Sequence, residues 1–408
     1  MTDFSSFGLH PSILNALEKK GYESPTPIQE KAISHVLEKR DLLGIAQTGT
    51  GKTAAFSLPI IHHIAINRVK IKPARVRCLI LTPTRELASQ IEENIKTYSK
   101  EIKLSSKCIF GGVGYRPQVQ AMSKGIDCLV ATPGRLIDLM DDGHILFEQL
   151  EFFVLDEADR MLDMGFLRDV KKIISKLPED KQTLLFSATM PKDIAQLSNT
   201  LLKDPIRVEV TPQSSTVEKI DQVIYKVERS NKPLLLKSII KKNNIKSVLV
   251  FTRTKHGADR VVKHLDRDGI TSAAIHGNKS QGARERALSG FRNKKIRVLV
   301  ATDIAARGID VSHVTHVINY HLPDDPKSYV HRIGRTARAG REGQAISFCD
   351  PDELKLLKGI EKTIKTEITV DETHEFHGVA AHVSKQTPKQ KPNHKKKFKK
   401  RKPTQKKD

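Results

Sequence analysis

The sequence predicts an α/β protein made of two parallel-sheet domains in tandem, followed by a disordered, basic C-terminal tail. Short apolar runs alternate with helical patterns along the chain, and this alternation restarts after a polar stretch at residues 211–216. From about residue 384 the composition turns to Lys, Pro and Gln. Strands that alternate with helices form mainly parallel sheets, and such a tail cannot bury enough apolar surface to fold.

Helical patterns come first, at residues 11–18 and 28–33, and two series of strands follow. The first series is expected at residues 42–45, 77–81, 106–110, 127–131, 152–155 and 183–186, and the second at 247–251, 271–275, 297–301, 316–319 and 344–348. Several of these runs are apolar without alternation, as in strands buried on both faces. In parallel sheets ligands bind beyond the carboxyl ends of the strands, so the polar motifs that follow the runs form the candidate site.

Composition bounds the class of protein. The 408 residues suffice for two or three domains. The net charge is +23, of which residues 384–408 carry +11 and the rest of the chain +12. This excess favours a polyanionic partner such as nucleic acid. The chain has no apolar run of about 20 residues and no signal-like N-terminus. Its four cysteines are scattered, as expected of free thiols in a reducing compartment. From these features we expect a cytoplasmic protein without membrane contact.

The motif Ala46-Gln-Thr-Gly-Thr-Gly-Lys-Thr53 organises the first domain. It follows an apolar run and precedes a helical one, which is the context of a phosphate-binding loop. Its glycines let backbone N–H groups face phosphate oxygens, Lys52 can reach the outer phosphates and the Thr53 hydroxyl can ligate Mg²⁺. The usual pattern begins with Gly where this chain has Ala46. The alternative is an ordinary Gly-rich turn, which the flanking patterns disfavour.

Acidic residues follow the apolar run at 152–155. A phosphate-loop enzyme needs a carboxylate at such a strand end to hold Mg²⁺, and Asp156 fits this role. Glu157 is placed to orient or deprotonate the attacking water. The alternative is a solvated acidic strand end, which becomes less plausible beside the phosphate loop.

The most basic compact stretch of the second domain contains Arg332, Arg335 and Arg338, spaced three apart. On a helix they share roughly one face. Guanidinium forks suit phosphate oxygens, so these residues are candidate arginine fingers. A solvated basic helix or an RNA-phosphate contact are the alternatives.

Together the motifs resemble those of the DEAD-box ATP-dependent RNA helicases. Asp156-Glu-Ala-Asp159 spells the family signature, and the resemblance runs in motif order from Phe4 to about residue 350. It implies two RecA-like domains and an enzyme that hydrolyses ATP on RNA binding and locally separates short duplexes or remodels RNA. Residues 276–284 and the basic tail resemble the bacterial RhlE subgroup. The family usually has Gly at the position of Ala337.

The resemblance assigns roles to residues of this chain. Lys52, Asp156, Glu157, Arg335 and Arg338 would be catalytic, with Thr53 and Asp156 holding Mg²⁺ through phosphate and water. The ATP-binding set would comprise Phe4, Tyr22, Gln29, Ala46, Gln47, Thr48, Gly49, Thr50, Gly51, Lys52, Thr53 and Asp310. Here Gln29 would read the adenine edge and Tyr22 would pack on the ring. Asp310 would contact the ribose.

The remaining roles concern RNA and coupling. RNA would be held by Pro83, Thr84, Arg85, Gly111, Gly112, Thr132, Pro133, Gly134, Arg135, Arg253, Arg284 and Thr302. Asp159, Ser187, Thr189 and His331 would couple the ATP state to the grip on RNA. Such contacts to phosphates and 2′-hydroxyls read little base sequence.

We expect residues 1–207 to form the ATP-binding domain, with a Q motif at 2–30, and residues 219–367 to form the second domain. Residues 208–218 would be the linker and 368–408 the basic tail, an electrostatic tether for RNA or else a solubilising segment. We expect a monomer whose partners are RNA and, by resemblance, ribosomal precursors or RNA-decay machinery. An ATP-gated RNA clamp or chaperone, and a processive superfamily 2 translocase, remain alternative functions.

Overall fold

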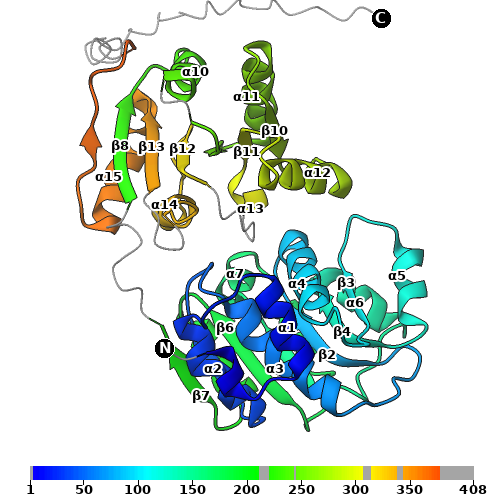
Figure 1. Ribbon diagram of the computed structural model, residues 1–408. Coiled ribbons are helices and arrows are strands. Elements are labelled where there is room, and N and C mark those ends of the chain that lie inside the picture. The colour runs from blue at the N-terminus through cyan, green and yellow to red at the C-terminus, as the bar shows by residue number, and fades with distance from the viewer. Residues whose placement is uncertain (1–2, 211–219, 243–244, 307–313, 338–342, 377–408) are drawn as a thin grey trace, which may run out of the picture.

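The computed structural model describes residues 3–210, 220–242, 245–306, 314–337 and 343–376. It contains two α/β domains, each built on its own sheet (Figure 1). In both sheets every pairing is parallel. The predicted fold of two parallel-sheet domains is therefore confirmed, while most of the predicted linker and the tail from residue 377 lie outside the described residues.

The first domain is built on a seven-stranded sheet of order β3-β4-β2-β5-β6-β1-β7. The strands are β1 (Leu42–Ile45), β2 (Val76–Leu81), β3 (Ser106–Ile109), β4 (Ile126–Ala131), β5 (Phe152–Leu155), β6 (Gln182–Ser187) and β7 (Ile206–Glu209). Every residue of β1, β2, β5 and β6 is buried. These central strands lie between two helical layers, which explains why their sequences lack alternation.

Helices cover both faces of the first sheet. One apolar cluster joins the sheet to η1 (Phe4–Phe7), α1 (Pro11–Lys19), α2 (Pro27–Leu37), α3 (Lys52–Ile66) and α4 (Arg85–Tyr98). A second cluster on the other face involves α5 (Tyr115–Met122), α6 (Pro133–Asp141), α7 (Ala158–Asp163), α8 (Leu167–Ile174) and α9 (Lys192–Leu201).

The second domain is built on a sheet of order β10-β11-β9-β12-β13-β8-β14. The strands are β8 (Ile220–Lys226), β9 (Val248–Phe251), β10 (Ser272–Ile275), β11 (Val298–Ala301), β12 (His316–Asn319), β13 (Gly343–Cys349) and β14 (Thr369–Val370). The helices are α10 (Lys232–Lys242), α11 (Lys255–Arg267), α12 (Gln281–Arg292), α13 (Asp303–Ala306), α14 (Pro326–Ile333), η2 (Pro351–Glu353) and α15 (Leu354–Ile364).

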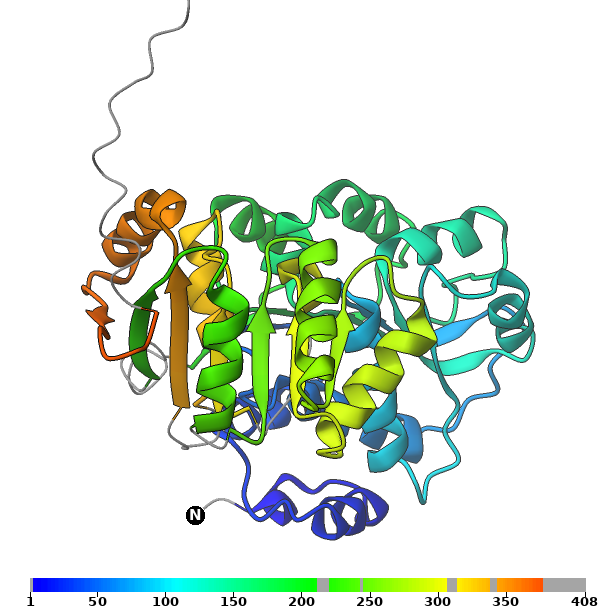
Figure 2. The ribbon, with the colours of Figure 1, turned by 90° about the horizontal axis from the view of Figure 1, so that it is seen from above.

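The two sheets have the same strand order. Adding seven to each strand number of the first sheet gives the order of the second, so β8 occupies the place of β1, β12 that of β5 and β13 that of β6. Figure 2 shows the second domain stacked over the first in a view from above. This equivalence allows the carboxyl ends of corresponding strands to be compared between the domains.

Three strands were not predicted from the sequence: β7, β8 and β14. β7 and β14 lie at the edges of the sheets, and the burial of β7 and β8 is mixed. Their sequences therefore lack the continuous apolar runs that identify the central strands. Residues 368–376, which we placed in the tail, contact the second domain: β14 pairs with β8, and the ring of His374 stacks on Tyr225 at 5.1 Å.

No helix in the described ranges is long and apolar enough to cross a membrane.

Gly44 of β1 is a place where the fold tolerates no side chain. A Cβ there would lie 2.5 Å from ring atoms of Phe186 in β6, the neighbouring strand. We predict that Gly44→Ala lowers the free energy of unfolding by about 1–3 kcal/mol, because overpacking displaces the buried ring.

Gly134→Ala is the matched control for this substitution, because a Cβ at Gly134 would meet nothing within 4 Å. Its unfolding free energy should stay within about 0.5 kcal/mol of wild type or rise. Urea unfolding of the two variants measures the difference. Equal stability of Gly44→Ala and wild type would contradict the packing argument.

Candidate functional site

A cavity of about 1040 Å³ lies beyond the carboxyl ends of β1 and β5, where the sequence predicted ligand binding. Polar residues from several elements line it. Those predicted from the sequence are Tyr22, Gln29, Thr48, Gly49, Gly51, Lys52, Thr53, Asp156 and Glu157. The parallel sheet therefore brings the phosphate loop, the acidic pair and the Q motif into one space.

The phosphate loop and the Q motif are locked together at Gly51. Gly51 has a φ of +96°, and a Cβ there would lie 2.4 Å from Nε2 of Gln29. That Nε2 donates to the Gly51 carbonyl at 3.1 Å, while Oε1 of Gln29 accepts from the Thr26 amide at 2.9 Å. Gly51 is thus required both for its backbone conformation and for the close approach of Gln29.

Lys52 and Asp156 place opposite charges in the buried part of the cavity. Lys52 is 6% exposed, and its Nζ donates to the Ala46 carbonyl at 2.9 Å. Burial raises the pKa of Asp156 to about 6, with Lys52 opposing the shift and Glu157 adding to it. The Asp156 carboxylate and the Thr53 hydroxyl, which line the same cavity, are hard oxygen donors that suit Mg²⁺.

Glu157 is held in an unusual backbone conformation, with a φ of 54°. Its carboxylate forms a buried ion pair with Arg160 at 2.9 Å, and Thr48 donates to it at 3.4 Å. Arg160 also donates to the Thr48 hydroxyl at 3.2 Å. Sequence reasoning missed Arg160, which fixes Glu157 against the phosphate loop.

Aromatic side chains support the Q-motif wall of the cavity. Tyr22 lines the cavity, whereas Phe4 does not and instead packs against Tyr22 with ring centroids 6.3 Å apart. The hydroxyls of Tyr22 and Tyr98 are 3.3 Å apart, and Lys20 lies over both tyrosine rings. Tyr98 and Lys20 were not predicted from the sequence, because neither belongs to a motif that we identified.

The predicted coupling residues Asp159, Ser187 and Thr189 lie together. The Asp159 carboxylate accepts from the Thr189 amide and hydroxyl, both at 2.9 Å, and the Asp159 amide donates to the Ser187 hydroxyl at 3.2 Å. His331 of the second domain interacts with this cluster through the charge of Asp159. Partial desolvation, Arg160 and Arg335 lower its pKa, and Asp159 opposes them.

Not every predicted ATP residue lies at the cavity. Ala46, Gln47 and Thr50 belong to the loop but do not line it. Arg335 is 4% exposed and borders a separate small cavity with His331 and Asp303. Asp310 and Arg338 lie outside the described residues.

A second candidate site lies where predicted RNA residues from both domains converge. Arg284 of α12 forms an ion pair with Glu86 of α4 at 2.9 Å. Burial and the nearby guanidinium groups of Arg284 and Arg135 lower the pKa of Arg85. A Cβ at Gly112, which has a φ of +81°, would lie 2.0 Å from Nη1 of Arg85. Arg284 and Arg85 thus lie near the buried Glu86 carboxylate, while Arg135 lies near Arg85 and pairs with Asp138 at 3.4 Å. Guanidinium groups gathered in this way suit an anion such as a phosphate.

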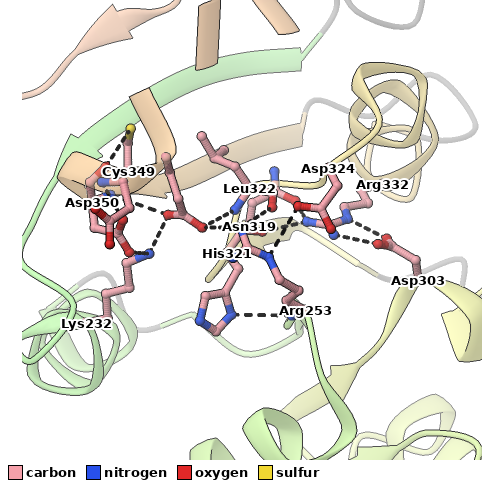
Figure 3. Close-up of polar contacts among 12 residues, drawn as sticks. Lys232, Arg253, Asp303, Asn319, His321, Leu322, Asp324, Arg332, Cys349 and Asp350 are labelled. Atoms are coloured by element: carbon pink, nitrogen blue, oxygen red, sulfur yellow. Dashed lines mark hydrogen bonds and ion pairs between the residues drawn. The ribbon is translucent and has the colours of Figure 1, made fainter. Parts of the chain in front are cut away.

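Other predicted RNA residues start helices at the same edge of the sheets. Thr84 caps α4 by accepting from the Leu87 amide at 3.3 Å, and Thr132 precedes α6, which begins at Pro133. Thr302 precedes α13. Pro83 is buried, whereas Gly111 is partly exposed and Gly134 exposed. Arg253, just beyond β9, lies apart in a network of ion pairs of the second domain (Figure 3).

Helices α4 and α12 connect the two candidate sites. At its start α4 carries Arg85 and Glu86, and further along it contributes Gln90 and Asn94 to the wall of the cavity. α12 places Arg284 against Glu86, and Arg292 at its other end lines the cavity. Arg292 could not be singled out from the sequence, because only the arrangement of the two domains brings it to the cavity.

The comparisons with known proteins agree with this geometry. Residues 26–197 match the family model described as DEAD/DEAH box helicase, and residues 231–340 match the helicase conserved C-terminal domain. The chain is 43% identical over 365 residues to the ATP-dependent RNA helicase CshA of Listeria monocytogenes, covering 90% of this chain and 69% of that protein. It is 44% identical over 368 residues to the RNA helicase CrhR of Synechocystis sp., covering 90% and 74%.

Among solved structures, the fold resembles S. cerevisiae Dbp5 bound to RNA and ADP BeF3. The TM-score is 0.77 at 31% identity, covering 91% of this chain and 96% of that one. The identity and coverage of these relatives, together with the two matching family models, show that the chain belongs to the DEAD-box family of ATP-dependent RNA helicases.

Proposed function

We propose that this chain hydrolyses ATP in the cavity of the first domain when RNA occupies the track formed by both domains, and thereby separates short RNA duplexes locally or remodels RNA. One observation carries the coupling. α4 and α12, one helix from each domain, each contribute to both sites. Glu86 and Arg284 lie at the second candidate site, which would form the RNA track, and Gln90 and Arg292 line the nucleotide cavity. A shift of α12 relative to α4 therefore acts on both sites, which is what coupling requires.

In this proposal the first domain supplies the chemistry. Lys52 binds the outer phosphates, Gln29 and Tyr22 hold the base, and Glu157 orients the attacking water. Hydrolysis of the γ-phosphate needs positioning and stabilisation of charge more than covalent help. Glu157 is pinned by Arg160 and Thr48, which limits its motion beside the phosphate loop.

Thr53 and Asp156 are the residues that would hold Mg²⁺. When bound, this ion neutralises charge on the phosphates. No cluster of three or more His, Cys, Asp or Glu residues that could hold a metal exists in the described ranges, so the phosphates of the nucleotide would complete the ion's ligand set.

The second domain supplies arginines in this proposal. Arg335 and Arg338 reach the γ-phosphate when the domains close on ATP and RNA together. Arg335 lies beside His331 and does not line the nucleotide cavity, so closure must bring it there. His331, which interacts with the cluster of Asp159 and Thr189 through the charge of Asp159, is placed to couple this motion to the first domain.

RNA contact rests on Arg85, Arg135 and Arg284, whose guanidinium groups share one region. We propose that phosphates displace the Glu86 carboxylate as the partner of Arg284. Recognition through phosphates reads little base sequence.

Finer assignments are proposals supported by the sequence alone. They are membership in the RhlE subgroup, the monomeric state, a cytoplasmic location and a role with ribosomal precursors or RNA decay. The relatives reported above carry other names, CshA and CrhR.

The first test measures ATP hydrolysis with single-stranded RNA, with single-stranded DNA and without nucleic acid. We expect RNA alone to stimulate hydrolysis strongly. Lys52→Ala should lower the RNA-stimulated kcat by about 10²-fold or more, because the positive charge that stabilises the phosphates in the transition state is lost. Equal stimulation by DNA, or none by either strand, would contradict the proposed coupling to RNA.

The second test concerns Arg292, which reaches the nucleotide cavity from the second domain. Arg292→Ala should raise the KM for ATP in the presence of RNA about five- to tenfold, the effect of losing roughly 1–1.4 kcal/mol of charged contact. Arg286→Ala on the same helix is the matched control, because Arg286 is exposed and lies outside the cavity lining. Equal KM values for both variants would show that Arg292 does not act on the nucleotide.

The third test concerns the basic tail, whose residues 384–408 carry a net charge of +11. Their deletion should weaken RNA binding and flatten its salt dependence, because fewer counterions are released. A tail of the same length with Lys replaced by Gln separates charge from length. An unchanged salt slope in both variants would indicate a solubilising tail.

A further inference from the structure

The second domain has no phosphate loop, yet it places a lysine where the first domain places Lys52. Lys52 is the first residue of α3, the helix after β1, and Lys232 is the first residue of α10, the helix after β8. β1 and β8 hold equivalent places in the two sheets. Lys232 is fully buried and pairs with Asp350 at 2.9 Å and Glu353 at 2.6 Å. Carboxylates of the same domain thus satisfy this lysine.

Glu353 has a second set of partners, which includes Arg253, a residue predicted from the sequence to bind RNA. It is 2% exposed, and its Oε1 accepts from Arg253 Nη2 at 3.0 Å and from the Leu322 amide at 3.2 Å. Its other oxygen, Oε2, accepts a hydrogen bond from the Lys232 ammonium. One buried carboxylate therefore bridges Lys232, which lies at the start of α10, and Arg253, which lies beyond β9.

These contacts fix one edge of the Arg253 guanidinium and leave the side chain accessible. Besides Glu353, Nη2 donates to the Leu322 carbonyl at 3.4 Å, and Nε lies 3.5 Å from Asp324. The Arg253 side chain is nevertheless 41% exposed. Figure 3 shows Arg253 among these partners, with Lys232 and Asp350 on the far side of the network.

The segment after β12 joins Glu353 to a second arginine. Arg332 is held by Asp303 at 2.5 and 2.6 Å and donates to the His321 carbonyl at 2.7 Å. His321 immediately precedes Leu322, whose amide is bound by Glu353. Glu353 therefore braces the segment whose carbonyls accept from both Arg253 and Arg332.

We propose that Glu353 is a positioning residue for RNA binding: it orients Arg253, through a direct ion pair and through Leu322, so that the guanidinium presents its exposed part to an RNA phosphate. This rests on the proposed RNA-dependent function and on the family resemblance, which assigns Arg253 to the RNA-binding set. Glu353 lies beyond residue 340, where the match to the helicase C-terminal family model ends, and belongs to none of the motifs identified in the sequence.

The test measures the Kd of a short single-stranded RNA with full-length protein and a non-hydrolysable ATP analogue. Glu353→Gln, which keeps the size and removes the charge, should weaken binding about tenfold, the effect expected for one arginine–phosphate contact. Asp352→Asn is the matched control, because Asp352 is exposed and precedes Glu353 directly. It should bind RNA like wild type.

A double-substitution cycle separates positioning from general destabilisation. Arg253→Gln should weaken RNA binding as much as Glu353→Gln, and the double variant should lose no more than either single one, because both remove the same contact. Additive losses of RNA affinity in the double variant would overturn the proposal.

Glu353→Asp keeps the experiment decisive if the glutamine variant fails to fold. It retains the buried charge for Lys232 but draws the carboxylate back, so RNA binding should weaken by an intermediate factor. Wild-type affinity in this variant would overturn the proposal. Tighter RNA binding in either Glu353 variant would also overturn it, because it would mean that Glu353 restrains Arg253 rather than presenting it.

The experiments distinguish a failure of this proposal from a failure of the proposed function. If wild-type hydrolysis is not stimulated by RNA, the proposed function fails and the proposal fails with it. If stimulation is present and Arg253→Gln weakens RNA binding while Glu353→Gln does not, only the positioning role of Glu353 is overturned.

Discussion

The buried ion pair between Arg284 and Glu86 is the contact on which the arrangement of the two candidate sites depends. Its members come from different domains and are 10% and 3% exposed at their side chains. Burial raises the pKa of Glu86, while Arg284 and Arg85 lower it. A charge buried at such a junction is costly unless it is paired. The pair therefore favours one mutual placement of α4 and α12, and an anion that competes for Arg284 weakens that preference.

The two domains treat equivalent positions in opposite ways. After β1, Lys52 lines a cavity together with Asp156, and its ammonium donates to a backbone carbonyl. After β8, Lys232 is fully buried between two carboxylates. Among the described residues, a cavity of about 1040 Å³ lies beside Lys52, whereas carboxylates enclose Lys232. The two equivalent positions therefore differ in the space and the charge that they offer to a phosphate.

Much of the fold could be predicted from the sequence because central parallel strands carry continuous apolar runs. The runs at 152–155 and 316–319 coincide with β5 and β12. β7, with the sequence Ile-Arg-Val-Glu, could not be predicted, since an edge strand needs burial on fewer sides. The motifs likewise located Lys52, Asp156 and Glu157 at one cavity, because parallel strands end at a common edge.

Site residues whose position depends on tertiary contacts could not be predicted from the sequence. Arg160, Tyr98 and Arg292 belong to no motif that we identified, and each contacts its site through elements distant in the chain, as Arg160 does through Thr48. Glu353 is the clearest example, since its partners Lys232 and Arg253 lie 121 and 100 residues away. A spacing rule cannot anticipate such a contact.

Ala337 shows how a backbone position can constrain a side chain in this family. It has a φ of 55°, in the left-handed region that favours glycine, and a Cβ at Gly343 would lie 2.5 Å from its amide nitrogen. A non-glycine residue in this conformation costs of order 1–3 kcal/mol and persists only where its surroundings enforce it. The family resemblance implies Gly at this position, and Gly adopts this φ without strain. In this chain Ala337 holds the conformation with Gly343 packed directly against it, and a side chain at residue 343 would not fit there.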